Sequence, residues 1–158
     1  MDDPVWDAFR RTNVRLTLPT GTFDIAPTAD LAPGEYLRGS PGPIHILTAQ
    51  NPMGLAASVA DNAAANAELA AELTGQTGLT VWPATGYGGG PIDAPDTWQE
   101  AGFAVEGLDR RDALELGIRY EQRAIFTWLH EPGGFRLVAC DGSSDEPRGW
   151  AATLTPRP

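Results

Sequence analysis

The chain has 158 residues, of which 42% are hydrophobic and 20% are charged, a balance typical of one folded domain and not of a disordered segment. The formal net charge of −10 comes from 21 acidic and 11 basic residues spread along the chain, which disfavours binding to nucleic acid. All 11 basic residues are arginine, so lysine Schiff-base chemistry and a P-loop lysine are excluded.

Cysteine usage and hydropathy predict the compartment. Cys140 is the single cysteine, so no intramolecular disulfide can form, which fits a reducing environment. Residues 1–4 lack the basic and apolar segments of a signal peptide, and no apolar run approaches the roughly 18 residues of a membrane span. We therefore expect an acidic, soluble protein of a bacterial-type cytoplasm with no membrane partner.

The N-terminal part, residues 1–43, is expected to be irregular apart from a strand. Residues 5–11 allow a short helical turn, and residues 14–18 alternate apolar and polar side chains, which predicts a strand. Residues 19–43 are rich in proline and glycine and predict an extended or hairpin connection. Because that connection is long, part of it, around residues 21–25, is expected to be a further strand.

The expected core, residues 44–140, begins with a strand over residues 44–49. Ser58 and Asp61 then have the spacing of a capping box, with Ser58 as the N-cap of an alanine-rich helix that runs to about Leu73. Glycines follow this helix and predict its end.

The middle of the core contains a second strand pair and a second helix. A short strand is expected over residues 79–82, a loop over residues 83–96, and a strand over residues 101–106. Residues 109–112 resemble a second capping box, so we expect a helix from there to about Gln122.

The last part of the core predicts a hairpin. Aliphatic and aromatic residues predict strands over residues 124–129 and 135–140, joined by a Pro-Gly-Gly turn at residues 132–134. Residues 141–158 are polar and bounded by prolines, and they predict a surface tail. We expect Trp150 to attach this tail to the domain.

Together these elements predict one α+β domain over residues 1–158. We expect a single mixed β-sheet of about five to six strands, two main helices packed on it, and a C-terminal hairpin. A helix between two neighbouring strands implies a right-handed crossover, whereas the hairpin implies an antiparallel edge.

The first long helix carries amides where apolar side chains are expected. Asn62, Asn66, Leu69 and Leu73 are spaced by four, three and four residues, so they lie in one stripe about 60° wide. Because the two leucines must face the sheet, Asn62 and Asn66 face it too. A buried amide without partners costs about 1–3 kcal/mol, so these two require an explanation.

Two interpretations of this stripe are open. In one, Asn62 and Asn66 hold the backbone of the loop at residues 50–53, which must lie just above that end of the helix. In the other, they line a polar crevice between the strand end and the helix N-terminus and bind a ligand there. Both interpretations place Thr48 and Asn51 in the same network.

Several of these residues also resemble the pattern of an uncharacterised bacterial family, domain of unknown function 3293. The resemblance rests on Thr48-Ala49-Gln50-Asn51-Pro52, on Asn62 and Asn66, on Trp98-Gln99-Glu100 with Phe103, and on Gln122-Arg123-Ala124. The chain departs from that pattern at Ala101-Gly102, where the family has Pro-Ser, and at Glu121, where it has glycine. The resemblance implies that Asn51, Asn62, Trp98, Glu100 and Gln122 belong to one site, and it implies no reaction.

Three of these residues have side chains suited to ligand binding or to structure. Trp98 could stack on a planar ligand or seal a core edge. Glu100 could be a general acid or base, or a solvated or arginine-paired carboxylate. Gln122 could cap carbonyls at a helix end or contact a polar ligand edge.

Other motifs point away from several enzyme classes. The glycines at residues 86–90 are not followed by a helix, so they do not form a dinucleotide-binding turn. His45 and His130 have no metal-ligand spacing, and no serine lies in a G-x-S-x-G motif. We expect no metal site and no cofactor.

The sequence thus predicts a domain that binds a small polar ligand, nucleotide-like or nucleobase-like, in an amide-rich crevice. The expected ligand contacts are Thr48, Asn51, Asn62, Asn66, Trp98 and Gln122, and Glu100 is the catalytic candidate. Whether the ligand is turned over is open. The alternative is a protein-interaction or regulatory module in which the amide network is purely structural and a protein partner binds elsewhere.

Overall fold

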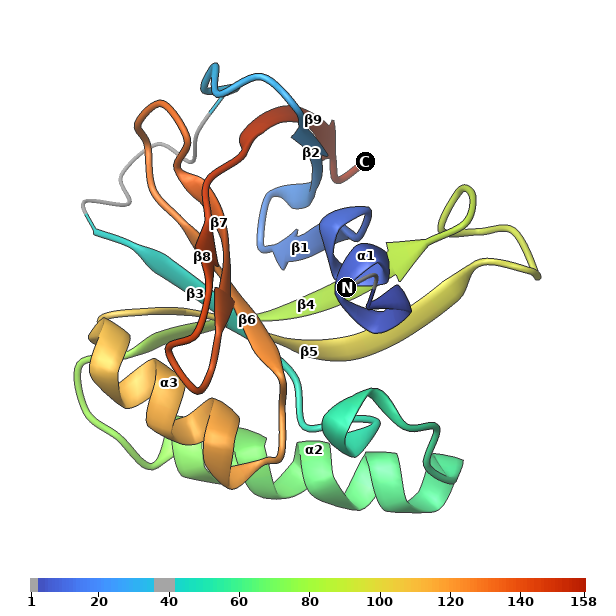
Figure 1. Ribbon diagram of the computed structural model, residues 1–158, viewed down its shortest axis with the longest axis vertical. Coiled ribbons are helices and arrows are strands. Elements are labelled where there is room, and N and C mark those ends of the chain that lie inside the picture. The colour runs from blue at the N-terminus through green and yellow to red at the C-terminus, as the bar shows by residue number, and fades with distance from the viewer. Residues whose placement is uncertain (1–2, 36–41) are drawn as a thin grey trace.

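One antiparallel β-sheet runs through the chain (Figure 1). The computed structural model describes residues 3–35 and 42–158, and in this part of the chain the sheet has nine strands in the order β8-β7-β6-β3-β5-β4-β1-β2-β9. The strands are β1 (Asn13–Leu18), β2 (Gly21–Thr28), β3 (Ile44–Leu47), β4 (Thr80–Gly88), β5 (Trp98–Glu106), β6 (Ala124–Trp128), β7 (Phe135–Ala139), β8 (Asp145–Glu146) and β9 (Gly149–Pro156).

The helices begin where the sequence places their capping residues. Ser58 Oγ accepts a hydrogen bond of 3.0 Å from the Asp61 amide and starts α2 (Val59–Thr74). Asp109 accepts one of 2.8 Å from the Asp112 amide and starts α3 (Arg110–Arg119). Two shorter elements precede them, α1 (Pro4–Arg10) and the 3₁₀ turn η1 (Pro52–Gly54).

The centre of the sheet is a βαββαβ unit. Its chain order is β3, α2, β4, β5, α3, β6, and its order in the sheet is β6-β3-β5-β4. This is the connectivity of the split βαβ, or ferredoxin-like, motif. The expected crossover between neighbouring strands was wrong, because each helix skips one strand: β5 lies between β3 and β4, and β3 lies between β5 and β6.

Both long helices cover the same face of this unit (Figure 1). Leu69 and Leu73 of α2 and Leu116 of α3 are buried in one cluster with Val105 of β5 and Ile125 of β6. The prediction that the leucine stripe of the first long helix faces the sheet is confirmed. Removing these side chains from water is the main stabilising contribution on this face.

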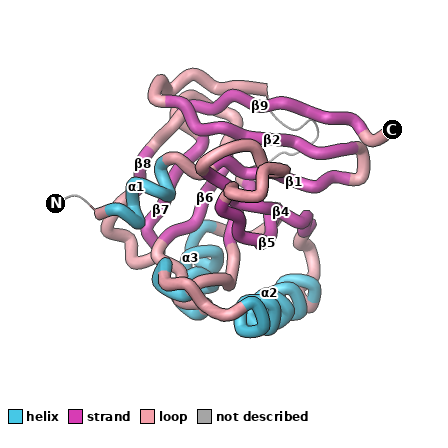
Figure 2. Tube along the Cα trace, turned by 90° about the vertical axis from the view of Figure 1, so that its right-hand side faces the viewer, coloured by secondary structure: helices cyan, strands magenta, loops and turns pink. Residues whose placement is uncertain are grey.

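The other face of the sheet is covered by the sheet itself. Strands β1, β2 and β9 curl away from the helices and close over the opposite side (Figure 2). Phe23 of β2 contacts Trp128 of β6 with 5.4 Å between ring centroids, and Trp128 contacts Trp150 of β9 at 5.9 Å. Since β3 is enclosed from both sides, all four of its residues are buried.

The α+β class and the two main helices agree with expectation, but the predicted sheet was too small and of the wrong type. In the described residues every ladder between named strands is antiparallel, so the expected mixed sheet was wrong. The first part of the expected loop over residues 83–96 is strand, since β4 extends to Gly88 and pairs along its whole length with β5. Residues 149–156, expected in a surface tail, form β9 and pair with β2.

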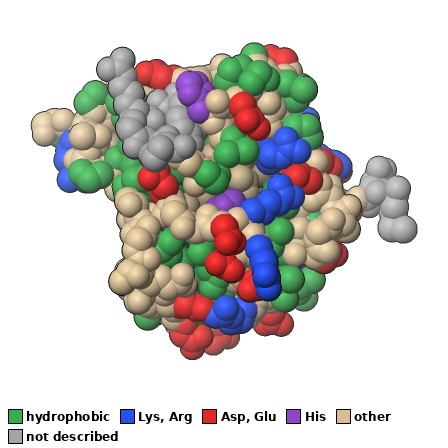
Figure 3. All heavy atoms as spheres, turned by 90° about the vertical axis from the view of Figure 1, so that its left-hand side faces the viewer, with side chains coloured by type: hydrophobic (Ala, Val, Ile, Leu, Met, Phe, Trp, Pro, Cys, Tyr) green, Lys and Arg blue, Asp and Glu red, His purple; other side chains and the backbone are tan. Residues whose placement is uncertain are grey.

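The surface carries charges of both signs. On the face drawn in Figure 3, acidic and basic side chains lie next to one another. Arg110 and Arg136 both pair with Asp145, at 2.8 and 2.7 Å. None of the helices in the described residues is long and apolar enough to span a membrane.

Candidate functional site

The candidate site starts where β3 leaves the core. After four buried residues the chain turns at Asn51, whose φ of 47° and ψ of 67° lie in the left-handed region. Asparagine tolerates this conformation better than most residues because its short side chain can bond locally. The Asn51 side chain does so by accepting a hydrogen bond of 3.0 Å from the Ala57 amide.

Asn66 joins this loop to the neighbouring strand. Its Oδ1 accepts a hydrogen bond of 2.9 Å from the Ala49 amide, and its Nδ2 donates one of 2.8 Å to the Ala101 carbonyl of β5. Both ends of the amide therefore bond to backbone groups that the ladder between β3 and β5 leaves unused. The Asn66 side chain thus links the chain after β3 to β5 beyond the last paired residues of the ladder.

Asn62 forms a reciprocal pair with Asn51. The Asn51 amide donates to Asn62 Oδ1 at 2.8 Å, and Asn62 Nδ2 donates to Asn51 Oδ1 at 3.0 Å. One turn of α2 thus holds the left-handed residue from both its backbone and its side chain. These bonds satisfy the polar groups that Asn62 brings into the interface between helix and sheet.

Thr48 and Gln122 complete the bonds around the loop. Thr48 Oγ1 donates to the Ala101 carbonyl at 2.6 Å and accepts from the Gln50 amide at 3.0 Å. Gln122 Nε2 donates to the Gln50 carbonyl at 2.9 Å and to the Tyr120 carbonyl at 3.1 Å. The loop after β3 is therefore fixed by α2, by β5 and by the segment that precedes β6.

Glu100 is the charged member of the network. Its Oε1 accepts a hydrogen bond of 2.6 Å from Asn51 Nδ2. Burial raises the pKa of the Glu100 carboxyl above its ordinary value, while the bond from Asn51 acts in the opposite direction. Among the described residues no arginine pairs with it.

The loop after β3 and the turn before β6 share a second contact. Met53 donates its amide to the Glu121 carbonyl at 2.6 Å, and both residues have a φ of 56°, in the left-handed region. Glycine adopts this conformation without cost, whereas a residue with a side chain such as Glu121 adopts it at some cost.

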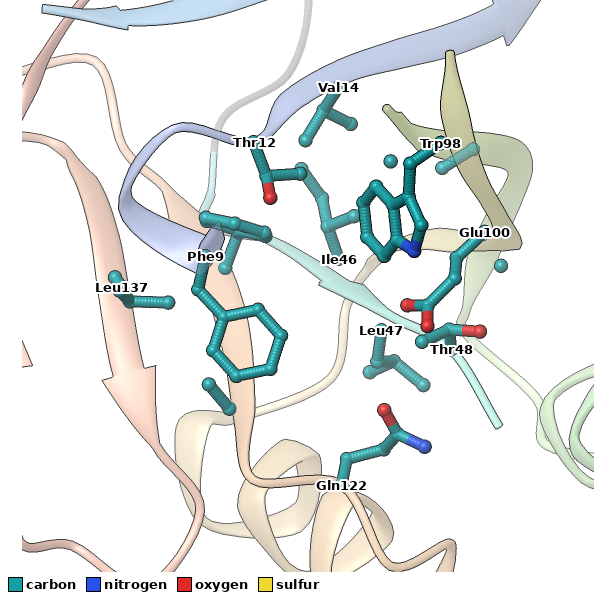
Figure 4. A pocket seen from close by; sticks show the side chains of 15 residues that line it. Phe9, Thr12, Val14, Ile46, Leu47, Thr48, Trp98, Glu100, Gln122 and Leu137 are labelled. Carbon is teal, nitrogen blue, oxygen red and sulfur yellow. The ribbon is translucent and has the colours of Figure 1, made fainter. Parts of the chain in front are cut away.

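A pocket opens beside Glu100 on the concave side of the sheet (Figure 4). It has a cavity volume of about 50 Å³, and its walls are mostly apolar. Figure 4 shows the Trp98 indole beside the Glu100 carboxylate, with Thr48 near the carboxylate and Gln122 further along the wall. The lining of this pocket includes Phe9, Thr48, Trp98, Glu100, Gln122 and Phe126.

A second pocket of about 270 Å³ adjoins the first. The two pockets share Phe9, Trp98 and Glu100 as walls, and Asn51 lines the outer one. We call the two pockets together the Glu100 cleft. Trp98 is 43% exposed, so this residue is partly accessible from solvent.

Helix α1 forms one wall of the Glu100 cleft through Phe9. The helix has no buried residue and is attached by polar contacts. Asp3 forms an ion pair with Arg123, and Glu146 accepts hydrogen bonds from Trp6 Nε1 at 3.0 Å and from Arg10 Nε at 2.9 Å. The pKa values of Asp3 and Glu146 are both lowered to about 2, chiefly by hydrogen bonds from Arg123 and Arg10.

The structure brings most of the sequence-predicted site residues together. One hydrogen-bonded network contains Thr48, Asn51, Asn66, Glu100 and Gln122, together with Asn62. Trp98 lies beside Glu100 on the same strand. Asn62 and Asn66 line neither pocket of the Glu100 cleft, so the stripe of amides and the cleft are separate features.

Sequence reasoning missed the apolar walls of the cleft. Phe9 comes from a helix that the sequence predicts only as a short turn, and Phe126 comes from a strand assigned to the core. The available signal was the aromatic content of residues 4–10, which is high for an exposed turn. In the described residues no group of three or more His, Cys, Asp or Glu side chains is arranged to hold a metal ion.

Comparison with known proteins gives one family. The model of the family described as "Protein of unknown function (DUF3293)" matches residues 47–125, half of the chain. The matched segment contains all seven predicted site residues but not α1, β1, β2 or β9. No curated protein and no solved structure matches the chain.

Proposed function

The chain belongs to the DUF3293 family, whose description assigns no activity, and we propose from its site that it binds a small planar ligand of the nucleobase type in the Glu100 cleft. One observation carries this proposal. A half-buried carboxylate with no cationic partner among the described residues lies where two pockets meet, beside a partly exposed tryptophan.

Glu100 supplies the hydrogen-bond acceptor. A carboxylate that is partly removed from water is costly unless donors satisfy its oxygens, and Asn51 supplies one. The exocyclic amino group or ring N–H of a nucleobase would supply more. The raised pKa also makes Glu100 the one acid–base candidate of the cleft, should the ligand be turned over.

Trp98 and Phe9 supply the apolar walls. A partly exposed indole can stack on a flat heterocycle, and Phe9 lines both pockets of the cleft as a second aromatic wall. The outer pocket of about 270 Å³ lies just under the lower limit of about 300 Å³ for sites that enclose drug-sized ligands. A single ring system suits this size better than a larger ligand does.

The charges of the cleft favour a ligand without phosphate. Among the described residues that line the two pockets none is basic, and the chain carries a net charge of −10. A phosphate would meet the field of Glu100 with no counter-charge. A nucleobase or nucleoside is therefore better supported as the ligand than the nucleotide that the sequence also suggests.

In this proposal the amides have two different roles. Asn51 and Gln122 line the cleft and orient its polar groups, whereas Asn62 and Asn66 only hold the loop. The competing function, a protein-interaction module, is favoured by three exposed apolar side chains close together in the chain: Met53, Leu55 and Val59. In that case the whole network would be a brace for a docking loop.

A binding screen separates these functions. Ligand-observed NMR with free nucleobases, nucleosides and their monophosphates would be run on the wild type, Glu100→Gln and Trp98→Ala. We expect a base or nucleoside to bind, and each substitution to weaken its binding at least about tenfold, as expected for loss of a charge-assisted hydrogen bond or a stacking contact. The matched control is Gln99→Ala, because the Gln99 side chain bonds to the Ile92 carbonyl instead of lining the cleft.

Three results would count against the proposal. They are the absence of any bound heterocycle, a hit whose affinity is the same in Glu100→Gln and Trp98→Ala, and a monophosphate that binds more tightly than its nucleoside. The first result would favour the interaction module.

A further inference from the structure

The two edges of the sheet differ in a way that points to a partner. At one edge, β8 has only two residues, both acidic, and both form ion pairs with arginines. Short, charged edges of this kind prevent pairing with another chain. At the other edge, β9 has eight residues and no charged side chain between Gly149 and Pro156.

The register of β9 shows which of its backbone groups face away from β2. The Trp150 amide donates to the Ala32 carbonyl on the outer side at 3.3 Å and not to Pro27, which lies opposite it in β2. The Arg157 amide bonds at 2.9 Å to the Thr20 carbonyl, next to the start of β2. Because successive residues of a strand point their N–H groups in opposite directions, even-numbered residues of β9 point outward.

Two residues therefore present open N–H groups at this edge, Ala152 and Leu154. Within residues 3–35 and 42–158, no backbone hydrogen bond outside the ladder with β2 involves residues 151–156. The start of the strand differs, since the Trp150 carbonyl lies against Gly34. The open part of the edge is thus residues 151–156.

The side chains of this open edge are suited to a second strand. Leu154 lies opposite Phe23 on the concave face but is 46% exposed, because in the described part of the chain β9 is the last strand at this edge of the sheet. Residues 147–158 contain two arginines and no acidic residue, although the chain as a whole is strongly acidic. Self-repulsion between two copies is therefore weaker here than a net charge of −10 implies.

We propose that β9 pairs with β9 of a second copy of this chain, antiparallel about a two-fold axis at Leu154. The Leu154 N–H of each copy donates to the Leu154 carbonyl of the other, and the Ala152 N–H of each donates to the other's Pro156 carbonyl. Centring the pair on Ala152 instead would place Leu154 opposite Trp150, where residues 32–34 already lie. The arrangement makes one continuous sheet and covers both Leu154 side chains.

The oligomeric state tests this proposal. Sedimentation velocity and light scattering over a concentration series should show a monomer–dimer equilibrium for the full chain. Leu154→Pro should abolish the dimer, because it removes an outward N–H and leaves the ladder with β2 intact. Leu154→Arg should abolish it as well, since two like charges would meet at the axis.

Val59→Arg is the matched control, because Val59 is 88% exposed on α2, away from the edge, and this variant should still dimerise. A wild type that stays monomeric up to about 1 mM overturns the proposal, and so does a dimer that persists in both Leu154 variants. Thermal unfolding of Leu154→Arg separates loss of the dimer from loss of the fold: a monomer with wild-type unfolding supports the proposal.

Discussion

The two faces of β5 have different surroundings. Toward α2, the polar groups at the end of β3 and β5 are bonded by Asn62, Asn66 and Thr48. Toward the concave side, Glu100 and Trp98 border open pockets. The amides that suggest a ligand site in the sequence are bonded to the loop after β3 and to β5, and we call this cluster the brace. Glu100, which has no cationic partner among the described residues, lies beside it. We expect substitutions in the brace to reduce stability and substitutions in the cleft to reduce binding.

The largest effect is expected at Gly102 of β5, which lies against the end of β3. A Cβ at this position would lie 2.3 Å from the Leu47 carbonyl oxygen and 3.0 Å from Thr48 Cβ. Gly102→Ala should therefore push β3 from β5 and lower the free energy of unfolding by about 3 kcal/mol or more, measured by urea denaturation. Gly88→Ala is the control, because its Cβ would meet only the Arg11 carbonyl, at 4.0 Å. Equal stability of the two variants would contradict this account of the close approach.

The next effect is expected in the brace. Asn66→Ala leaves the Ala49 N–H without its acceptor, and we expect a loss of about 1–3 kcal/mol in the free energy of unfolding. The Ala101 carbonyl keeps its bond from Thr48, so the loss should not be larger. Glu68→Ala, at an exposed position of the same helix, should change stability by less than about 0.5 kcal/mol. If Asn66→Ala leaves the free energy of unfolding unchanged, water must replace the side-chain amide as the partner of the Ala49 N–H. The interface between α2 and the sheet would then be open to water at this point.

A smaller and opposite effect is expected at Glu100. Its folded-state pKa is raised above the ordinary value of 4.5, so ionising it costs the folded state stability as the pH rises through the folded pKa. Glu100→Gln keeps an acceptor for Asn51 and removes this cost. The free energy of unfolding of Glu100→Gln, minus that of the wild type, should be lowest below about pH 4.5 and should increase toward pH 8. Urea titrations at several pH values would measure this difference. A difference that does not change with pH would show that Glu100 is well solvated.

The smallest effect is expected at α1, which walls the cleft. The pKa values of Asp3 and Glu146 are lowered to about 2, so their ion pairs contribute above the ordinary pKa values of 3.8 and 4.5 and are lost as the pH falls toward 2. We expect the ¹⁵N NMR signal of the Trp6 indole to shift in that range while the buried Trp128 indole does not. Glu146→Gln should produce the same shift of Trp6 at neutral pH. A Trp6 signal that titrates near pH 4.5 would argue against the ion pair.

The parts of the fold that were predictable are local ones. Ser58 and Asp109 could be assigned as caps because a capping bond spans three residues, and Asn62 and Asn66 could be placed toward the sheet because helical spacing fixes their direction. The network from Thr48 to Gln122 followed from those placements and from the family pattern.

The parts that were missed depend on pairing between distant segments. β9 has few large apolar residues and becomes a strand because β2, more than 120 residues earlier, offers a complete ladder. Gly86 and Gly88 suggest a loop, yet they lie in β4 because Glu100 and Trp98 stand opposite them. The concave pocket could not be predicted, since it arises only when the sheet curls.

The left-handed conformation of Glu121 has a consequence for how this chain could change. A non-glycine residue in this region costs roughly 1–2 kcal/mol, which the native bond from Met53 to its carbonyl must offset. Replacing Glu121 with glycine removes that backbone cost without touching any side chain of the network. The position is thus a reserve of stability that a single substitution could release.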